Sequence, residues 1–532
     1  MDSVTAIIWV VAFVLVTVAV TGVAGRFGLS APFLLVAIGA VASFVPGIPT
    51  VEIEPDLVLY AVLPPLLFAA AIRTSFAEIR ARGDSIFLLS VGLVAFTFVT
   101  VGMTAWLVIP GITIAAALAF GAVVAPTDAV AVTALTGRLR LPRRLVTILE
   151  GESLLNDAVA LVALSASITA IVGQVTAGSV ALDLVLALGV GVGGGFVVGW
   201  LLSFVKQKVQ SAVLDTSLSL VAPYIAFIPV QLLHGSGVLA VVIAGLILAH
   251  RSPAIQSAEA RIAESINWRT IRFLLENAVF LLIGLSLAGI VEEAVQSSPG
   301  LWPSVLIGGA VLLAVFASRV LWVLGTTVLY RKGPQRLRER GWTWRNSAAV
   351  AVSGIRGVVT LIAVFLLPEE TPYRGFLQFL AFVVIAASLA GGLALPWVIR
   401  RLRLPPPNEM QEQTQRRLLL SEAKAAGLAR LDETVGDAEE DAVINRLRVN
   451  GRFLLDDYPD DPEPGTEAPQ AAYARLRKDM IRAEREAVRS ARAEGRYEEY
   501  AVRAVLAAID AEELALKATA TGAGAPPRRQ QN

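Results

Sequence analysis

The sequence predicts an all-α membrane protein of roughly thirteen transmembrane helices followed by a helical cytoplasmic tail. The first observation is the composition, because 55% of the 532 residues are hydrophobic and only 17% are charged. A water-soluble chain of this length needs more polar surface, so the excess of apolar side chains must face lipid. The second observation is a repetition of apolar runs, most of them close to the 20 or so residues that cross a bilayer.

The expected spans follow one another along the first four hundred residues. The first of them starts after Asp2 with no basic residue before it, so we interpret it as a retained span and not as a signal peptide. In chain order the spans are 4–24, 29–46, 56–72, 85–109, 113–135, 146–172, 179–204, 214–232, 236–250, 268–290, 302–329, 346–367 and 375–399.

Basic residues concentrate in alternate loops, among them 73–83, 136–145 and 330–345. The loops between them carry almost none, and two of these, 51–56 and 291–296, are acidic. Basic loops face the cytoplasm in membrane proteins. The pattern therefore predicts a cell-membrane protein, embedded in the lipid bilayer, with its N-terminus outside and its C-terminus in the cytoplasm.

The composition changes after the last span and predicts three regions. Residues 1–404 form the transmembrane domain, and residues 405–515, rich in Glu, Arg and Ala, form a cytoplasmic helical tail. Residues 516–532 have the composition of a disordered C-terminus. The tail is either a solvated helical appendage or a domain with regulatory or dimer-supporting interactions.

Several classes of function are excluded by what the sequence lacks. The net charge of +1 gives no reason to expect nucleic-acid binding. The absence of cysteine excludes thiolate sites, and two histidines make a His-built metal site implausible. The tail holds no phosphate loop, metal cluster or catalytic triad, so we expect neither an enzyme nor a cofactor.

An ionisable side chain inside an apolar run is costly and marks function. In the run 119–135, Pro126 lacks an amide donor and is followed at once by Thr127 and Asp128. Such a sequence favours an interrupted helix whose free carbonyls and ends coordinate an ion. The alternative is a kinked helix in which Asp128 bonds to a neighbouring helix.

The second such segment is 149–164, where Glu152 and Asn156, and likewise Ser153 and Asp157, are four residues apart. On a helix these two pairs line adjacent strips of one face. The alternative, polar contact between helices, explains the serine and the asparagine but explains two acids poorly.

These side chains predict a site for a small cation, because hard cations prefer oxygen ligands. Asp157, Asp128, Thr127 and Ser153 supply such oxygens, together with the carbonyls of the broken helix. A carboxylate held away from water takes up either a proton or a cation, but not both. Competition of this kind is sufficient for antiport, provided that the carrier reorients only when it is loaded.

Two arginines also lie within spans. Arg319 and Arg356 should each face an acid or the carbonyls of a helix C-terminus, because an unpaired buried guanidinium is very costly. Gly354 and Gly357 flank Arg356 and indicate a second interrupted helix, placed as an inverted repeat would place it. The alternative is a tightly packed glycine site. A further charge, Glu276, is expected to pair with Arg272 rather than to bind substrate.

With these motifs in order, the chain resembles the monovalent cation:proton antiporter-1 (CPA1) family of bacterial sodium/proton exchangers. The resemblance is carried by PTDAV at 126–130, EGESLLNDA at 150–158, the late-span Arg319 and SGIRG at 353–357, with LPPLLF at 63–68 in support. It covers about residues 5–400. It implies a sodium/proton antiporter fold with inverted repeats and two interrupted crossing helices.

The resemblance also implies roles for individual residues. Asp157 would be the essential ion- and proton-binding carboxylate, with Asn156 as its companion, and Thr127 and Asp128 would form the unwound part of the fifth span. The remaining roles are a further ligand at Ser153, a structural ion pair between Glu152 and Arg319, and the second crossing helix at Gly354, Arg356 and Gly357. Sodium would be held by Asp157, Asp128, Thr127 and Ser153.

At the level of the whole protein, the resemblance implies a homodimer that exchanges sodium for protons without net charge movement and serves pH homeostasis. Core helices at about 85–172 and 302–399 would move in an elevator-like manner against dimerisation helices at about 4–72 and 179–290. One departure concerns Ala69 to Ala71, where relatives often carry an acid, and it bears on affinity and selectivity.

Three alternatives stay open from the sequence. The oxygen ligands do not distinguish Na⁺ from K⁺ or Li⁺, so a K⁺/H⁺ antiporter of the same fold is the nearest one. A cation channel would need a continuous polar stripe, whereas the polar residues here cluster at the middle of the spans. A membrane-anchored signalling protein is the most remote.

Overall fold

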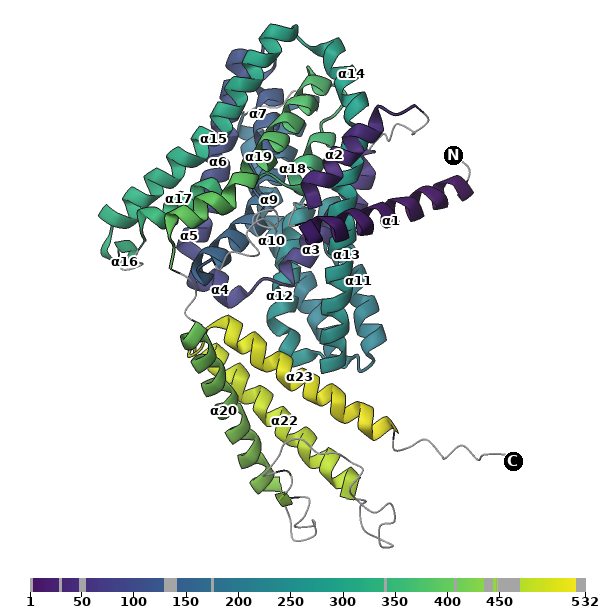
Figure 1. The fold of residues 1–532 in the computed structure, drawn as a ribbon, viewed down its shortest axis with the longest axis vertical. Helices are drawn as coiled ribbons and strands as arrows, with labels where there is room; N and C mark the ends of the chain where they lie inside the picture. Colours follow the sequence, from purple (N-terminus) through teal and green to yellow (C-terminus); the bar gives the residue numbers. More distant parts are fainter. Residues whose placement is uncertain are drawn as a thin grey trace. The chain divides into compact units, whose positions relative to one another are not determined.

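The computed structural model describes residues 3–27, 31–46, 54–128, 141–173, 177–338, 342–405, 409–434, 444–445, 447 and 469–522. Over these ranges the chain is helical and has no strand (Figure 1). It divides into two compact units. The first consists of Met1–Val205, Ser217–His250 and Ile266–Pro407, and the second of Lys206–Thr216, Arg251–Ser265 and Asn408–Asn532.

The apolar part of the chain folds into long helices and short helical segments. Up to the first interruption they are α1 (Ser3–Phe27), α2 (Ala31–Ser43), η1 (Leu57–Val62), α3 (Leu63–Ala71), α4 (Phe76–Ala81), α5 (Gly83–Phe87), η2 (Leu88–Gly92), α6 (Leu93–Val108) and α7 (Ile114–Val124). The middle of the chain holds α9 (Arg143–Val172), α10 (Ala177–Lys208), α11 (Ala212–Leu232), α12 (Gly237–Ile255), α13 (Ala258–Leu285) and α14 (Leu287–Ser297). The last group is α15 (Leu301–Lys332), α16 (Gln335–Arg338), α17 (Trp344–Val352), α18 (Val358–Phe365) and α19 (Arg374–Leu402).

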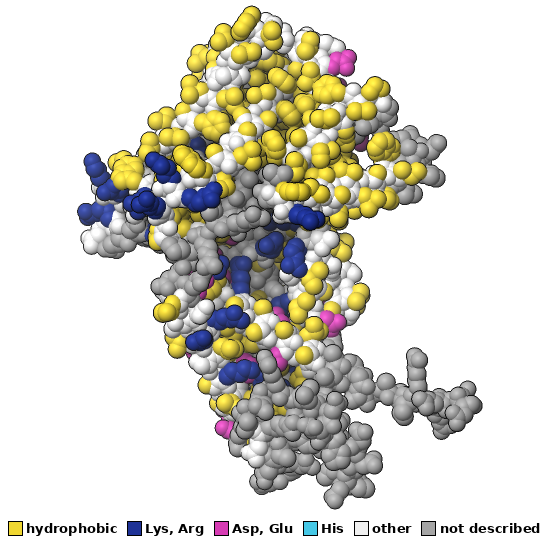
Figure 2. Space-filling view, viewed as in Figure 1, with side chains coloured by type: hydrophobic (Ala, Val, Ile, Leu, Met, Phe, Trp, Pro, Cys, Tyr) yellow, Lys and Arg dark blue, Asp and Glu magenta, His cyan; other side chains and the backbone are white. Residues whose placement is uncertain are grey.

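Among the described residues, seven helices are long and apolar enough to cross a membrane, and the bent pair of α13 and α14 would make an eighth. Shorter apolar helices lie in α1, α2, η1–α3 and α7. Large apolar side chains such as Leu107, Val197 and Leu313 are exposed, and such residues cover much of the upper surface in Figure 2. The all-α membrane class is confirmed, while the number thirteen stays a prediction.

One span is interrupted in its middle, as the glycines of SGIRG predict. The helix stops at Val352 and resumes at Val358, and Ser353–Gly357 between them is not helical. Both glycines are required by close approach. A Cβ on Gly354 would collide with the side chain of Arg319, and one on Gly357 would collide with the carboxylate of Asp128.

The fifth predicted span is also helical only in part. Helix α7 ends at Val124, and Ala125 to Asp128 are not helical. Pro126 explains the break, because its ring cannot donate a backbone hydrogen bond and clashes with the preceding turn. Residues 129–140, which include the rest of that span and part of the basic loop 136–145, lie outside the described residues.

The second unit is built on three helices of the tail, which pack side by side: α20 (Glu409–Thr434), α22 (Pro469–Ala493) and α23 (Glu499–Gly522). Leu419, Ile481 and Val502 belong to its apolar core. Helix α23 continues to Gly522, beyond residue 516, where a disordered end was predicted. The sequence KATAT is consistent with this continuation, because lysine and alanine favour helix. Residues 523–532 lie outside the described residues.

The same unit includes the turns that join α10 to α11 and α12 to α13. Lys206 forms ion pairs with Asp215 at 3.2 Å and with Glu264 at 2.8 Å, and Gln256 donates hydrogen bonds to both acids. Arg261 of α13 binds both carboxylate oxygens of Asp510 on α23. The contact between Arg261 and Asp510 therefore joins the tail to the first turns of α13.

We expect the Arg261–Asp510 contact to hold the tail in place. Arg261→Glu puts two carboxylates together, and loss of a contact worth about 2 kcal/mol should speed protease cleavage of the tail by on the order of tenfold or more. The measurement is limited proteolysis of the purified full-length protein. Arg482→Glu, at an arginine side chain that is 70% exposed on the same bundle, is the control. Arg261→Glu with Asp510→Arg should restore protection, and cleavage of Arg261→Glu at the wild-type rate would contradict the contact.

Candidate functional site

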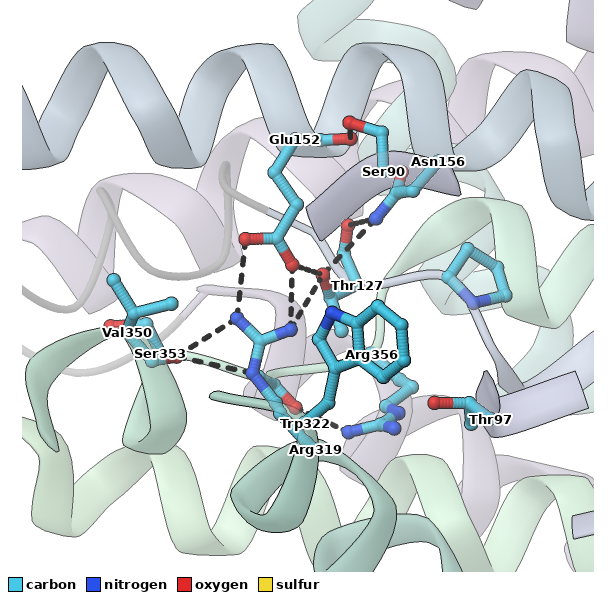
Figure 3. Close-up of polar contacts among 12 residues, drawn as sticks. Ser90, Thr97, Thr127, Glu152, Asn156, Arg319, Trp322, Val350, Ser353 and Arg356 are labelled. Atoms are coloured by element: carbon cyan, nitrogen blue, oxygen red, sulfur yellow. Dashed lines mark hydrogen bonds and ion pairs between the residues drawn. The ribbon is translucent and has the colours of Figure 1, made fainter. Parts of the chain in front are cut away.

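A buried ion pair joins two long helices of the first unit (Figure 3). Arg319 of α15 meets Glu152 of α9 with an Nη1–Oε1 distance of 2.6 Å, and both side chains are 2% exposed. The same guanidinium donates from Nε and Nη2 to the carbonyl of Val350, at 3.1 and 2.9 Å. The pair implied by the resemblance is therefore formed, and it joins α9, α15 and α17.

The interrupted segment after α7 is attached to this ion pair. The hydroxyl of Thr127 donates to Oε1 of Glu152 at 2.9 Å. Asn156 donates from Nδ2 to the carbonyl and the hydroxyl oxygen of Thr127, at 2.9 and 3.1 Å. Among the described residues, Oδ1 of Asn156 is buried and has no hydrogen-bond partner. An acceptor oxygen therefore stays available beside the broken helix.

The two interrupted segments lie against each other. The backbone N–H of Asp128 donates to the carbonyl of Ile355 at 2.7 Å, and Thr360 donates to the carbonyl of Pro126 at 3.4 Å. The carboxylate of Asp128 packs on the backbone of Gly357, where a larger residue would displace it. The crossing of the two segments therefore fixes the position of Asp128.

Arg356 is buried and donates hydrogen bonds to backbone carbonyls at both helix interruptions. It is 1% exposed, donates from Nε to the carbonyl of Val124 at 3.2 Å and from Nη1 to that of Gly354 at 2.6 Å, and lies over the ring of Phe316. Its backbone N–H donates to the hydroxyl of Ser388 on α19 at 3.1 Å. A cation near the carbonyl end of a helix is favourable, so this arginine stabilises the interruption electrostatically.

Asp157 and Ser153 occupy the adjacent strip of α9, as their spacing predicts. Both are half-buried, unlike Glu152 and Asn156, which are buried. Asp157 lies within electrostatic range of Asp128 and of Arg272 on α13. The structure thus places the two predicted carboxylates within electrostatic range of each other, and both are less buried than Glu152.

The site contains contributors that the sequence reasoning missed. The carbonyls of Val124, Val350 and Ile355 accept hydrogen bonds that no side-chain pattern could reveal. Ser388 and Thr360 had a weak signal, since Ser388 is the one hydroxyl side chain of the span 375–399 and Thr360 is one of three in the span 346–367. Ala69 and Ala71, at the position that departs from the family pattern expected from the sequence, are fully buried in the apolar core.

A family model described as the transmembrane sodium/hydrogen exchanger matches residues 11–401, which is most of the chain. The chain belongs to this family. An uncharacterized Na⁺/H⁺ exchanger of Mycobacterium tuberculosis is 30% identical to it over 527 residues, covering 95% of both chains. A low-affinity Na⁺/H⁺ antiporter of Synechocystis is 29% identical over 457 residues, covering 80% of this chain and 82% of its own.

The exchanger fold is supported separately by a solved structure. The sodium/proton antiporter MjNhaP1 of Methanocaldococcus jannaschii superposes with a TM-score of 0.60 at 19% identity, covering 74% of this chain and 100% of its own. At this identity the likeness concerns the fold. The exchanger is thus a multi-pass membrane protein of a transporter family.

Gly357 offers a direct test of the crossing in this exchanger. Gly357→Ala adds a Cβ that overlaps the carboxylate of Asp128, so we expect cation-dependent proton flux to fall by about tenfold or more while the protein still folds. The measurement is flux in proteoliposomes together with the size-exclusion profile. Gly325→Ala is the matched control, because a Cβ there meets nothing within 4 Å. Full flux in Gly357→Ala would contradict the close contact.

Proposed function

We propose that this chain is a secondary antiporter that exchanges Na⁺ for H⁺ by letting the two ions compete for Asp157. The observation that carries the proposal is a difference among the acids of the site. Glu152 is buried and bound by Arg319 and Thr127, whereas Asp157 and Asp128 are half-buried and lie within electrostatic range of each other beside the interrupted segment. The sodium/proton exchangers and antiporters among the relatives support the same function.

The ligands of the transported cation would be oxygens. We assign them to Asp157, Asp128, Ser153 and Thr127, with Asn156 holding the carbonyl of Thr127 in place. The free Oδ1 of Asn156 is suited to bind the ion or one of its waters. Oxygen ligands of this kind replace the hydration shell of a hard cation.

Coupling follows from the competition. A carboxylate that releases its proton to bind Na⁺ carries the same net charge in both loaded states, so we propose one-for-one exchange without net charge movement. If only loaded states reorient, the downhill ion drives the other uphill. No cofactor takes part in such a cycle, and no covalent chemistry is needed.

The motion and assembly are proposed in the same way. Core helices at about 85–172 and 302–399 would carry the site past dimerisation helices at about 4–72 and 179–290, in a homodimer. The protein would lie in the cell membrane with its N-terminus outside, its tail at 405–515 in the cytoplasm, and a role in pH homeostasis.

A second candidate is exchange of K⁺ or Li⁺ at the same site. One relative is named a sodium, potassium, lithium and rubidium/H⁺ antiporter, from Bacillus subtilis, at 30% identity over 409 residues, covering 72% of this chain and 60% of its own. Transport assays with each alkali cation in turn distinguish these substrates. A channel would instead show flux that does not depend on an opposing proton gradient.

The proposal predicts a specific loss of transport in Asp157→Asn. The amide has no proton to exchange and no charge for the cation, so exchange should fall below detection in proteoliposomes with a pH-sensitive dye. Asp183→Asn, at an exposed acid on α10, is the control that keeps exchange. Sodium-driven dye signals that survive in Asp157→Asn would defeat the proposal.

A further inference from the structure

A pair of opposite charges lies on α13 near the ion site, and the proposed mechanism does not use it. Arg272 donates to Glu276 with an Nε–Oε1 distance of 2.5 Å, and each side chain is 18% exposed. The apolar residues FLL between them and the apolar residues AVFLLIGL that follow Asn277 place the pair within a span. With the exposed Arg269, these charges stand at i, i+3 and i+7 and follow one face of the helix.

A matching strip runs along α9. Glu150, Ser153 and Asp157 also stand at i, i+3 and i+7, and exposure falls from the exposed Glu150 to the half-buried Ser153 and Asp157. Side chains along this strip therefore lead from the accessible end of the helix towards the carboxylate that is proposed to bind the ion.

The two strips are close enough to interact. Arg272 lies within electrostatic range of Asp157, Asp128 and Glu150, and Glu276 within range of Asp128. Arg73, in the turn after α3, interacts with Glu150, Arg272 and Glu276. Among the described residues, these charged groups act on the pair from the turn after α3, from α9 and from the segment after α7, and Arg269 shares its face of α13.

Stability alone is a poor explanation for the pair. Half-buried charges lose hydration, and an ion pair in such a place is commonly no more stable than apolar residues of the same size. Ionisable side chains within spans usually serve the path or the site of an ion. The carboxylates of Asp128 and Asp157 lie within electrostatic range of the Arg272 guanidinium, so its charge affects their affinity for cations.

We propose that Arg272, oriented by Glu276, is the counter-charge of the empty ion site. Its guanidinium offsets the charges of Asp128 and Asp157 when no cation is bound, and Glu276 limits this effect by pairing with it. The pair thereby sets how tightly the site binds a cation. This inference rests on the proposed function of Asp157.

The size of the effect follows from Coulomb's law. For two unit charges on the order of 10 Å apart in a medium of intermediate dielectric, removing one of them changes cation binding at the other by roughly three- to tenfold. The same substitution changes the proton affinity of these carboxylates in the same direction as their cation affinity. The apparent KM for Na⁺ therefore shifts at alkaline pH, where protons do not compete, and stays nearly constant at acid pH, where the two changes cancel.

The test measures the apparent KM for Na⁺ in proteoliposomes at alkaline pH, in two variants that each neutralise one member of the pair. Arg272→Gln should lower the apparent KM for Na⁺ by about fivefold, and Glu276→Gln should raise it by a similar factor. The double variant Arg272→Gln/Glu276→Gln should lie near the wild type. If the pair were purely structural, both single variants would instead lower the exchange rate, and their KM values would not shift in opposite directions.

The controls keep the outcome decisive. Arg272→Lys preserves the charge and should keep the KM within about twofold. If Arg272→Gln does not fold, the test compares the apparent KM for Na⁺ of Glu276→Gln, which should be raised, with that of Arg272→Lys, which should stay near the wild type. Equal or absent KM shifts in a protein whose exchange is abolished by Asp157→Asn would overturn this inference alone. Wild-type protein without exchange that depends on Asp157 would overturn the proposed function as well.

Discussion

A charge inside a membrane span must be balanced by its neighbours, because water is not there to do so. In this protein the first balance is struck between Glu152 and Arg319, each almost fully buried. Their bond is joined by the hydroxyl of Thr127 and the carbonyl of Val350. Removing one partner of such a pair usually costs about 3–5 kcal/mol, so this contact ties three helices to the interrupted segment.

Hydrogen bonds to the free backbone groups explain why the helices can be interrupted within the membrane. An interrupted helix exposes carbonyls and amides that lipid cannot satisfy. Arg356 takes up the carbonyls of Val124 and Gly354, and the amide of Asp128 meets the carbonyl of Ile355. Asp157 and Asp128 lie beside these engaged groups and are close enough to influence each other electrostatically. The proposed ion site therefore lies next to the crossing that these contacts stabilise.

Much of this arrangement could be predicted from the sequence, for identifiable reasons. The apolar runs are long enough to specify membrane helices, and Pro126 and the glycines of SGIRG mark the interruptions. The pairing of Arg272 with Glu276 follows from helical spacing. That of Glu152 with Arg319 follows from the family resemblance, since 167 residues separate them.

Other features depend on tertiary packing and leave little trace in the sequence. Backbone carbonyls carry no residue type, so the acceptors at Val124 and Val350 could not be foreseen. The contact of Gly357 with Asp128 requires two segments to cross at van der Waals distance. The attachment of the tail through Asp510 to Arg261 joins residues 249 positions apart, and neither side chain is distinctive in its local sequence.

The central claim is that one carboxylate site holds either a proton or a cation. The most direct measurement is titration calorimetry of the purified protein with Na⁺, in buffers of different ionisation enthalpy, which counts the protons released per ion bound. Release should approach one proton per Na⁺ at acid pH and should vanish at alkaline pH, where the site is already deprotonated. Sodium binding that depends on Asp157 yet releases no proton at any pH would contradict it.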